Sequence, residues 1–539
     1  MSTKQKLELN WIGKHKRPRL EPRIFLEDKE LSYGDANNEN LLIHGDNLLA
    51  LKALEQKYAG KVKCIYIDPP YNTGSAFEHY DDGLEHSMWL SLIKSRLELL
   101  WSLLDPKEGT LWVSIDDREM PYLRIVLDEI CGRSSFIAAN VWQKRYSREN
   151  REAIGDVHEY ILVYAKDKMN FKKIRNKVPF TEQQAKVYRN PNNDPNGPWR
   201  PIPMTAQAGH ATAEQFYEIV SPSGKVFVPP EGRCWGISEK TFKRYLSEGK
   251  IYFGKNGDSQ PNVIRYLSEV DGATPWTWWP SEEVGHTDES KKEQHYLFGK
   301  NLAFDTPKPE RLIQRIIHIA TNPGDLVLDS FAGSGTTGAV AHKMGRRWIM
   351  VELGEHCHTH IVPRLKKVID NEDQGGITKT VNWQGGGGFR YLRLAPSLLK
   401  KDHWGNWVIN KEYNAEMLAE AMCKHMNFTY APSQTQYWNH GYSTETDYIY
   451  VTTGSLAYEQ LKALSEEVGT ERTLLICCKA FMTEGTDFPN LTLIKIPRAI
   501  LSKCEWDQDD YSFTLNVISE PEQPDDIDYD EYAEGEEQL

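Results

Sequence analysis

Hydrophobic and polar residues along the chain follow two periods, one typical of strands and one typical of helices. Residues 63–67 and 109–117 are short apolar runs rich in strand-forming residues, which predict buried strands. Residues 86–104 instead repeat large apolar side chains every three to four positions, which predicts a helix with one apolar face. The residues of that face are Trp89, Leu92, Ile93, Leu97, Leu100 and Leu104.

Strand and helix patterns alternate on both sides of a long interruption. A strand pattern runs into a helix pattern in residues 41–54, and residues 120–131 and 159–166 predict a further helix and strand. The alternation returns at residues 307–321, an amphipathic helix pattern that is followed by a strand, a helix and another strand up to residue 353. Such alternation predicts an α/β fold with a parallel sheet between helices.

The interruption, residues 169–300, has a different composition. It is rich in Pro, Gly, Asn, Lys and aromatic residues and includes Trp199, Trp235, Trp276, Trp278 and Trp279. This composition predicts an inserted module of short strands and loops, in which most of the tryptophans form a small core. A further α/β pattern covers residues 391–505, and the glycine run at 385–388 is expected to be the linker that leads to it.

The overall composition is that of a globular protein. The 539 residues are 40% hydrophobic and 11% aromatic, which is ordinary for a chain of two to four domains. No apolar run predicts a membrane span or a signal peptide. The eight cysteines include no CxxC pair, and adjacent Cys477 and Cys478 are expected to be packed thiols. These features favour a cytoplasmic location.

The net charge of −13 is concentrated at one end of the chain. Residues 505–539 contain 14 acidic residues and no Lys or Arg, so the rest of the chain has a net charge of +1. Residues 506–539 are therefore predicted to form an acidic tail. Its Pro- and acid-rich last part, residues 519–539, is predicted to be disordered, with a solubilising role favoured over a partner-binding one. The rest of the chain can carry basic patches, such as residues 142–151, so the net charge does not exclude a nucleic-acid partner.

A carboxylate follows the predicted strand at 63–67. Asp68 precedes Pro69 and Pro70, which have no N–H and fix φ, so the chain leaves the sheet in a rigid corner. That corner holds the Asp68 carboxylate, two free carbonyls and the ring of Tyr71 at the carboxyl end of a strand. Because Pro and Asp also simply end strands, this motif alone leaves a structural role open.

A second motif is built from glycines. Gly333, Gly335 and Gly338 have the spacing GxGxxG, after a predicted strand and at the start of a predicted helix. Glycine lets the backbone turn tightly near a ligand, and the start of a helix offers free N–H groups. Glu352 ends the next strand, where a carboxylate can bind ribose hydroxyls. The pattern predicts a nucleotide-like cofactor, and a nicotinamide dinucleotide would suit it almost equally well.

The order of the two motifs along the chain indicates which fold would bring them together. In a doubly wound sheet, the strand with the glycine loop lies beside the strand that starts the second half. Here the glycine loop comes late in the chain and Asp68 comes early. If the sheet is circularly permuted, the two motifs lie at adjacent strand ends, and a substrate meets the cofactor at the Asp68 corner.

These ordered motifs resemble a known family. "DPPY" at 68–71, followed much later by "DSFAGSGTT" at 329–337, resembles the β-class amino-group DNA methyltransferases, in which the catalytic motif precedes the cofactor loop. The strings "YIDPPYNTGSAFEHYDD", "HSMWL", "IDDRE" and "FDTPKPERLI" are similar to the modification subunits of type III restriction-modification systems. The resemblance covers about residues 36–395 without the inserted module. It implies a circularly permuted Rossmann-like methyltransferase sheet.

The resemblance also implies a division of the chain into domains. The inserted module would be the target-recognition module, and a C-terminal α/β domain would follow the sheet. The ranges are an N-terminal leader at 1–35, the methyltransferase core at 36–168 and 301–390, the target-recognition module at 169–300, the C-terminal domain at 391–505 and the acidic tail at 506–539.

The cofactor implied by the resemblance is S-adenosylmethionine. Its adenine would lie near Asp46 and its ribose on Glu352, although an N-cap role competes for Asp46. Its methionine end would lie over Phe331 to Gly335, with its carboxylate on Lys308. The remaining predicted cofactor contacts are Asp68, Asp329, Gly333 and Thr336.

The catalytic residues implied are Asp68, Pro69, Pro70 and Tyr71. The lone pair of adenine N6 is delocalised into the ring, which makes the amine a poor nucleophile. Asp68 and the Pro69 carbonyl would accept its two hydrogens and direct the lone pair towards the sulfonium methyl, while Tyr71 stacks on the base. Such catalysis is positioning and electrostatics, and the base must first be flipped out of the duplex.

We therefore expect an adenine-N6 methyltransferase that acts on double-stranded DNA. By resemblance it is a type III modification subunit that forms a homodimer and binds a restriction subunit with helicase and nuclease activity. Cytosine-N4 methylation and a stand-alone or phage-defence adenine methyltransferase are alternatives within the same class. A Rossmann oxidoreductase explains the glycines but not DPPY, and an inactive DNA-binding scaffold leaves the intact motifs unexplained.

Histidines give no metal site in this sequence. His356 and His360 are i and i+4 on a predicted helix, but without a third ligand they are expected on a solvated helix face. His158 begins the string "HEY", which resembles the segment that lines the base pocket in the family, although a histidine at a strand start is more often a packing residue.

Overall fold

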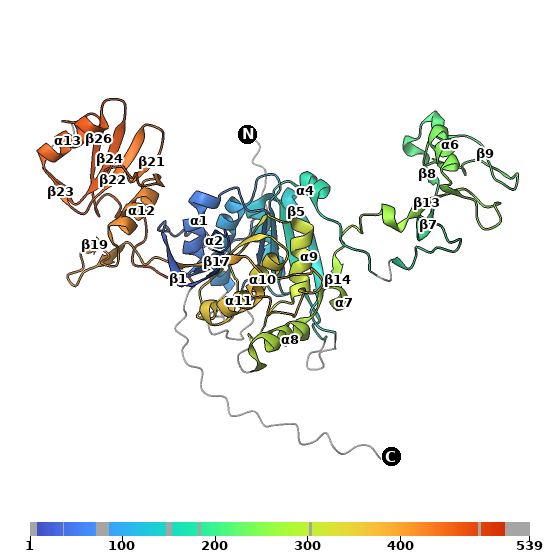
Figure 1. The fold of residues 1–539 in the computed structure, drawn as a ribbon, viewed down its shortest axis with the longest axis horizontal. Helices are drawn as coiled ribbons and strands as arrows, with labels where there is room; N and C mark the ends of the chain where they lie inside the picture. Colours follow the sequence, from blue (N-terminus) through green and yellow to red (C-terminus); the bar gives the residue numbers. More distant parts are fainter. Residues whose placement is uncertain are drawn as a thin grey trace, which may run out of the picture. The chain divides into compact units, whose positions relative to one another are not determined.

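A computed structural model describes residues 8–35, 37–71, 86–146, 154–181, 185–300, 304, 306–482 and 487–512. The chain forms two compact units (Figure 1). The first consists of Met1–Ile174 and Thr277–Leu539, and the second is Arg175–Trp276.

The first unit is built on a ten-stranded mixed sheet in the order β1-β17-β2-β16-β15-β3-β4-β6-β5-β14. The strands from β17 to β4 run parallel to their neighbours, while β1 and β6 run antiparallel to theirs. The bounds are β1 (Phe25–Gly34), β2 (Leu41–His44), β3 (Cys64–Ile67), β4 (Thr110–Ile115), β5 (Phe136–Gln143), β6 (His158–Ala165), β14 (Trp278–Trp279), β15 (Leu326–Asp329), β16 (Arg347–Glu352) and β17 (Gly388–Leu394).

Two late strands lie between two early ones, which confirms the predicted circular permutation. β15 and β16 are inserted between β2 and β3, and β15 pairs in parallel with β3 through Leu328 and Ile65. All four residues of β3 and of β15 are buried, as expected for strands covered on both faces. The carboxyl ends of the strands that carry the two motifs are therefore adjacent.

The helices of this unit follow the predicted periodicity. Those that precede the second sheet of the unit are α1 (Asn47–Tyr58), α2 (His86–Leu103), α3 (Met120–Leu127), α4 (Lys168–Ile174), α7 (Ser281–Val284), α8 (Thr287–Phe298), α9 (Glu310–Ala320), α10 (Thr336–Lys343) and α11 (Val362–Ile369). The six residues of the predicted apolar face at 86–104 are all buried. Among the residues described, no helix is both long enough and apolar enough to cross a membrane.

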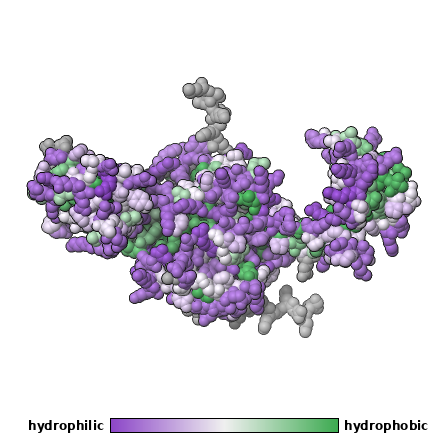
Figure 2. Space-filling view, turned by 45° about the horizontal axis from the view of Figure 1, so that its top comes forward, coloured by the Kyte–Doolittle hydropathy of each residue, from purple (hydrophilic) through white to green (hydrophobic). Residues whose placement is uncertain are grey.

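The second unit consists of short strands around a small core, as the composition predicts. Its strands are β7 (Trp199–Pro203), β8 (Thr205–Gln207), β9 (Ile219–Val220), β10 (Val226–Phe227), β11 (Arg233–Trp235), β12 (Ile251–Tyr252) and β13 (Asn262–Tyr266), with α6 (Glu239–Ser247). Trp235 is buried in a cluster with Met204, Ile219 and Phe242. Figure 2 shows hydrophobic surface on this unit. Its exposed apolar residues include Val220, Val226 and Val228, each more than half exposed.

This unit is shorter than the predicted module of 169–300. Residues 277–300 belong to the first unit, because β14 pairs with β5 and the Trp142 indole donates to the carbonyl of Gly285 at 2.9 Å. Of the five tryptophans, Trp276 and Trp278 are 50% and 44% exposed, so not all of them contribute to a core.

A second sheet follows β17. It has the order β20-β21-β22-β24-β26, with bounds β20 (Thr429–Tyr430), β21 (Gly441–Tyr442), β22 (Asp447–Val451), β24 (Thr473–Cys478) and β26 (Leu491–Lys495). Helices α12 (Ala415–His425) and α13 (Tyr458–Val468) and the pairs β18–β19 (Leu399–Lys401, Trp407–Ile409) and β23–β25 (Ser455–Leu456, Ala480–Phe481) complete it. Cys477 and Cys478 are buried free thiols, as predicted.

Both ends of the described chain are more structured than the sequence indicates. Part of the predicted leader forms β1, which pairs with β17 at the edge of the main sheet. The start of the predicted acidic tail also packs, since Asp509 pairs with Arg23 at 2.6 Å and the N–H of Tyr511 donates to Asp46. Residues 513–539 of that tail lie outside the described residues.

Candidate active site

The strand β3 ends at the corner formed by Asp68, Pro69 and Pro70. The Tyr71 hydroxyl donates to Asp68 Oδ1 at 2.6 Å, so the Tyr71 side chain turns back towards the carboxylate of the same corner. The Pro70 carbonyl accepts a hydrogen bond from the Trp89 indole at 2.7 Å. Of the two carbonyls that the sequence leaves free, the Pro70 carbonyl is therefore already engaged, which leaves the Pro69 carbonyl as the candidate acceptor.

The glycine loop lies at the end of the neighbouring strand, β15. Gly333 and Gly335 have φ values of +51° and +75°, in the left-handed region that favours glycine. A Cβ on Gly335 would lie 2.8 Å from the Ile361 Cγ2 atom, so close packing also requires glycine there. The loop therefore turns into α10 with its backbone at the carboxyl edge of the sheet.

A cavity of about 370 Å³ lies between the two motifs. It is lined by nine of the twelve predicted site residues: Asp68, Pro69, Pro70, Tyr71, Lys308, Asp329, Phe331, Gly333 and Thr336. The two motifs, more than 250 residues apart in the chain, thus form one pocket.

The polar residues of the cavity carry charges of both signs. Lys308 Nζ lies 2.6 Å from Asp68 Oδ2 and 3.7 Å from Glu159 Oε2. Burial by itself would lower the pKa of Lys308, but the charges of Asp68 and Glu159 outweigh it and raise the pKa above its usual value. Lys308 is therefore an ammonium held between two carboxylates.

Asp329 ends β15 and is buried. Its carboxylate accepts hydrogen bonds from the N–H of Phe331 at 2.9 Å and from the Thr337 hydroxyl at 2.5 Å. Burial raises the pKa of Asp329 to about 7, against the effect of these two hydrogen bonds. Asp329 fixes the start of the glycine loop and is a carboxyl that titrates near neutral pH.

Three predicted cofactor residues do not line the cavity: Asp46, Gly335 and Glu352. Asp46 is the N-cap of α1, accepts from the N–H of Leu49 at 3.0 Å and pairs with Arg96 at 3.2 Å. The competing N-cap role is therefore present, and a contact between Asp46 and a cofactor stays a prediction.

Glu352 is fully buried and engaged with the backbone. One carboxylate oxygen accepts from the N–H of Gly333 at 2.7 Å, and the other accepts from Leu353 and Gly354. Although burial would raise the pKa of Glu352, the hydrogen bond and charge of His356 and these N–H groups hold it below its usual value. Glu352 thus connects the glycine loop to β16 by a hydrogen bond, and its hydrogen bonding to a ribose stays a prediction.

A network of buried ion pairs contacts the glycine loop. Arg364, on α11, donates to the carbonyl of Ser334 and to the Thr336 hydroxyl at 3.2 and 2.8 Å. It also pairs with Glu310, which pairs with Lys343 at 2.9 Å. The side chains of Arg364, Glu310 and Lys343 are at most 2% exposed. Buried charges therefore connect the glycine loop with helices α9, α10 and α11.

The predicted solvated face at His356 and His360 is wrong for His356. This side chain is buried, its Nε2 lies 3.1 Å from a Glu352 oxygen and its ring contacts Phe304. The prediction rests on the lack of a third metal ligand, which does not determine burial, whereas the fold turns this residue towards Glu352 and Phe304.

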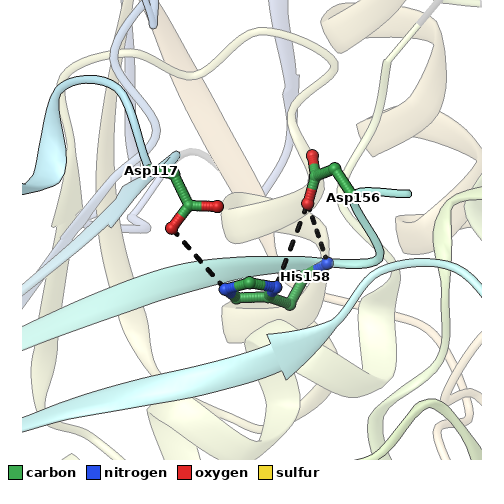
Figure 3. A group of neighbouring side chains, drawn as sticks. All are labelled: Asp117, Asp156 and His158. Atoms are coloured by element: carbon green, nitrogen blue, oxygen red, sulfur yellow. Dashed lines mark hydrogen bonds and ion pairs between the residues drawn. The ribbon is translucent and has the colours of Figure 1, made fainter. Parts of the chain in front are cut away.

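His158 lies between two aspartates at the start of β6 (Figure 3). Its imidazole is 3.6 Å from Asp117 and 3.9 Å from Asp156. The ligand atoms of the three residues are within 4.8 Å of one another, a spacing that one cation would accept. Because Lys144 already lies 2.8 Å from Asp156, however, that carboxylate has a cationic partner, and the group is best described as an ion-pair cluster.

Sequence reasoning missed some of the residues that line the cavity. Glu159 contacts the Tyr71 hydroxyl at 3.1 Å, and Lys144, Arg145 and Phe304 also line the cavity. The string "HEY" places Glu159 at a strand start, but only the position of β6 in the main sheet, beside β4 and β5, brings its side chain to Tyr71.

Comparison with known proteins agrees with this geometry. A family profile described as DNA methylase matches residues 62–363, more than half of the chain, and this match contains both motifs. The chain belongs to the DNA methylase family. Its relatives include two type III Mod subunits, HindVI of Haemophilus influenzae and StyLTI of Salmonella typhimurium, and the type II methyltransferase M.EcaI of Enterobacter cloacae.

These relatives of the methylase differ in how much of their length is matched. Identity is 34% with HindVI Mod over 66% of this chain and 54% of the relative, and 35% with StyLTI Mod over 59% and 51%. With M.EcaI it is 30% over 64% of this chain and 75% of the relative. The methylase chain thus spans about half the length of the two Mod subunits.

Proposed function

We propose that this DNA methylase transfers a methyl group from S-adenosylmethionine to N6 of adenine in double-stranded DNA. The observation that carries the proposal is the single cavity that joins the Asp68 corner to the glycine loop. Membership of the DNA methylase family supports the same reaction.

The cavity residues suit this cofactor chemically. S-adenosylmethionine, when bound, supplies a methyl group on a positively charged sulfur, and the electron pair of the broken C–S bond stays on that sulfur. The cavity carries the carboxyl groups of Asp68, Glu159 and Asp329, and the first two lie at the corner that receives the substrate amine. Lys308, Lys144 and Arg145 provide positive charge for a carboxylate, and the Phe331 and Phe304 rings line the remaining wall. A zwitterionic ligand with an aromatic base fits such a mixed surface.

The Asp68 corner activates the amine. Asp68 and the Pro69 carbonyl accept the two N6 hydrogens, which leaves the nitrogen lone pair free to form the new N–C bond. Asp68 is placed to receive the proton that the methylated amine gives up. The Tyr71 ring packs on the base, which must leave the duplex to reach the corner.

The DNA duplex would bind outside the pocket, and only the flipped base would enter it. Lys144 and Arg145 lie at the cavity and belong to the basic stretch at 142–151, where they suit phosphate contacts. The second unit, Arg175–Trp276, is our candidate for base recognition in the target sequence.

The Mod relatives suggest a place in a restriction-modification system. We infer a type III modification subunit that dimerises and binds a helicase-nuclease restriction subunit, by likeness to relatives named as Mod subunits. A stand-alone or phage-defence adenine methyltransferase and a cytosine-N4 enzyme are the other candidates.

One assay separates these activities. The protein is incubated with a donor that carries a labelled methyl group and with plasmid DNA, and the DNA is digested to nucleosides. Label in N6-methyladenosine supports the proposal, and label in N4-methylcytosine selects the cytosine enzyme. Absence of label in both nucleosides on DNA that contains all short sequence contexts would remove the proposed function.

A further inference from the structure

Both oxygens of Asp68 are already in use. Oδ1 accepts the Tyr71 hydroxyl at 2.6 Å, and Oδ2 accepts the Lys308 ammonium at 2.6 Å. A substrate amine that donates to Asp68 must displace one of these donors, and the displaced donor then needs another acceptor. This holds most strongly for Lys308, whose side chain is only 12% exposed.

Glu159 faces the same two donors from the other side. It lies on β6, two strands from β3 in the sheet, and its side chain is only 11% exposed. Its Oε2 atom is 3.1 Å from the Tyr71 hydroxyl and 3.7 Å from Lys308 Nζ. Both donors therefore lie between the two carboxylates, closer to Asp68 than to Glu159.

Lys144 holds Glu159 in this position. Its ammonium lies 3.5 Å from the other Glu159 oxygen, Oε1, and 2.8 Å from Asp156. Oε2 is thus directed towards Tyr71 and Lys308, while Oε1 is occupied on the opposite side. The carboxylate is fixed as an acceptor and not free to turn into solvent.

We propose that Glu159 is a positioning residue that receives the Tyr71 hydroxyl and the Lys308 ammonium when Asp68 accepts the substrate amine. This inference rests on the proposed function and adds a residue to it. Each donor needs to move only a short way, because each already lies within 4 Å of both carboxylates. The exchange keeps every buried charge paired, so it avoids the penalty of leaving an ammonium without a counter-charge.

The inference predicts a particular defect when the Glu159 charge is removed. In Glu159→Gln the side chain keeps its size, but Tyr71 and Lys308 stay with Asp68, so the amine is bound less well in the reacting geometry. We expect the single-turnover methyl-transfer rate to fall by about 10- to 100-fold, the range of one to two hydrogen bonds to a charged group. Cofactor affinity, measured by calorimetric titration, should change by less than about twofold.

Two further variants separate positioning from general damage. Asp156→Asn is the matched control, since it also removes a negative charge beside Lys144 but touches neither Tyr71 nor Lys308; its rate should stay within about twofold of the parent. Tyr71→Phe frees Asp68 Oδ1 in advance, so Glu159→Gln in that background should cost at least about threefold less than in the parent.

The outcomes are distinguishable. Equal costs of Glu159→Gln in both backgrounds, or a parent-like rate in the single variant, would overturn the role of Glu159. If Glu159→Gln does not fold, Glu159→Asp serves instead, because it keeps the charge but withdraws it and should lose rate with unchanged cofactor affinity. A parent protein that transfers no methyl group refutes the proposed function, and the role of Glu159 falls with it. An active parent together with a parent-like Glu159→Gln variant refutes the role of Glu159 alone.

Discussion

Lys308 Nζ lies 2.6 Å from Asp68 Oδ2, although 240 positions separate the two residues. The contact joins the segment before α9 to the corner after β3, and it holds the carboxylate that we assign to the reaction. The charges in the pocket therefore come from both chain segments of the first unit, Met1–Ile174 and Thr277–Leu539.

Asp68→Ala should abolish methyl transfer and keep cofactor binding. The carboxylate that accepts the amine is lost, while the glycine loop is untouched. We expect the rate to fall by at least about 1,000-fold, as for removal of a principal electrostatic group. Labelled-methyl transfer measures the rate, and calorimetric titration measures the affinity for S-adenosylmethionine. A variant that remains fully active would show that the catalytic assignment is incorrect.

Gly335→Ala should weaken both the loop and the cofactor site. The new Cβ would lie 2.8 Å from Ile361 at a φ of +75°. We expect a loss of about 1–3 kcal/mol in the free energy of unfolding and weaker cofactor binding. Gly345→Ala is the control, since φ there is +71° but no atom lies within 4 Å of the added Cβ. A similar loss of cofactor affinity in both variants would contradict the prediction that the glycine loop forms part of the cofactor site.

Lys343→Met should destabilise the protein strongly. The ammonium is fully buried between Glu310 and Asp373, at 2.9 and 2.7 Å, and its removal leaves those carboxylates with less compensation. We expect a loss of about 3–5 kcal/mol in the free energy of unfolding, measured with urea. Lys52→Met removes a partly exposed ion pair of the same unit and should cost at most about 1 kcal/mol. Equal costs would show that the buried network contributes no special stability.

The contribution of Glu293 to stability should fall as the pH rises from about 5 to about 8. Burial, with the neighbouring charge of Glu310, raises the pKa of Glu293 to about 8 in the folded protein. Because the folded state binds this proton more tightly than the unfolded state, stability is highest below the unfolded pKa and declines until the pH passes about 8. Asp329, with a pKa of about 7, adds a loss of the same sign at lower pH.

Glu293→Gln isolates this effect. The variant has no proton to lose at this position, so its urea midpoint should decrease less than that of the parent between about pH 5 and pH 8. An identical decrease in the two proteins would mean that Glu293 does not titrate in this range.

The sequence by itself determined the local features of this protein. Two prolines after Asp68 force the strand to end, and the glycines at 333 and 335 take a backbone conformation that other residues disfavour. The buried face of α2 follows from its apolar period in the same way. Steric limits and periodicity act over a few residues, so they can be inferred from neighbouring positions in the chain.

Only the tertiary structure decided what each carboxylate faces. Asp46 and Glu352 are in the motif positions that suggest a ligand, yet both accept hydrogen bonds from the protein. Glu159 lies in the string "HEY", which suggests the base pocket but no partner, and the sheet brings its side chain to Tyr71. The partner of a buried charge depends on which distant strands become neighbours, and that choice is made by packing of the whole sheet.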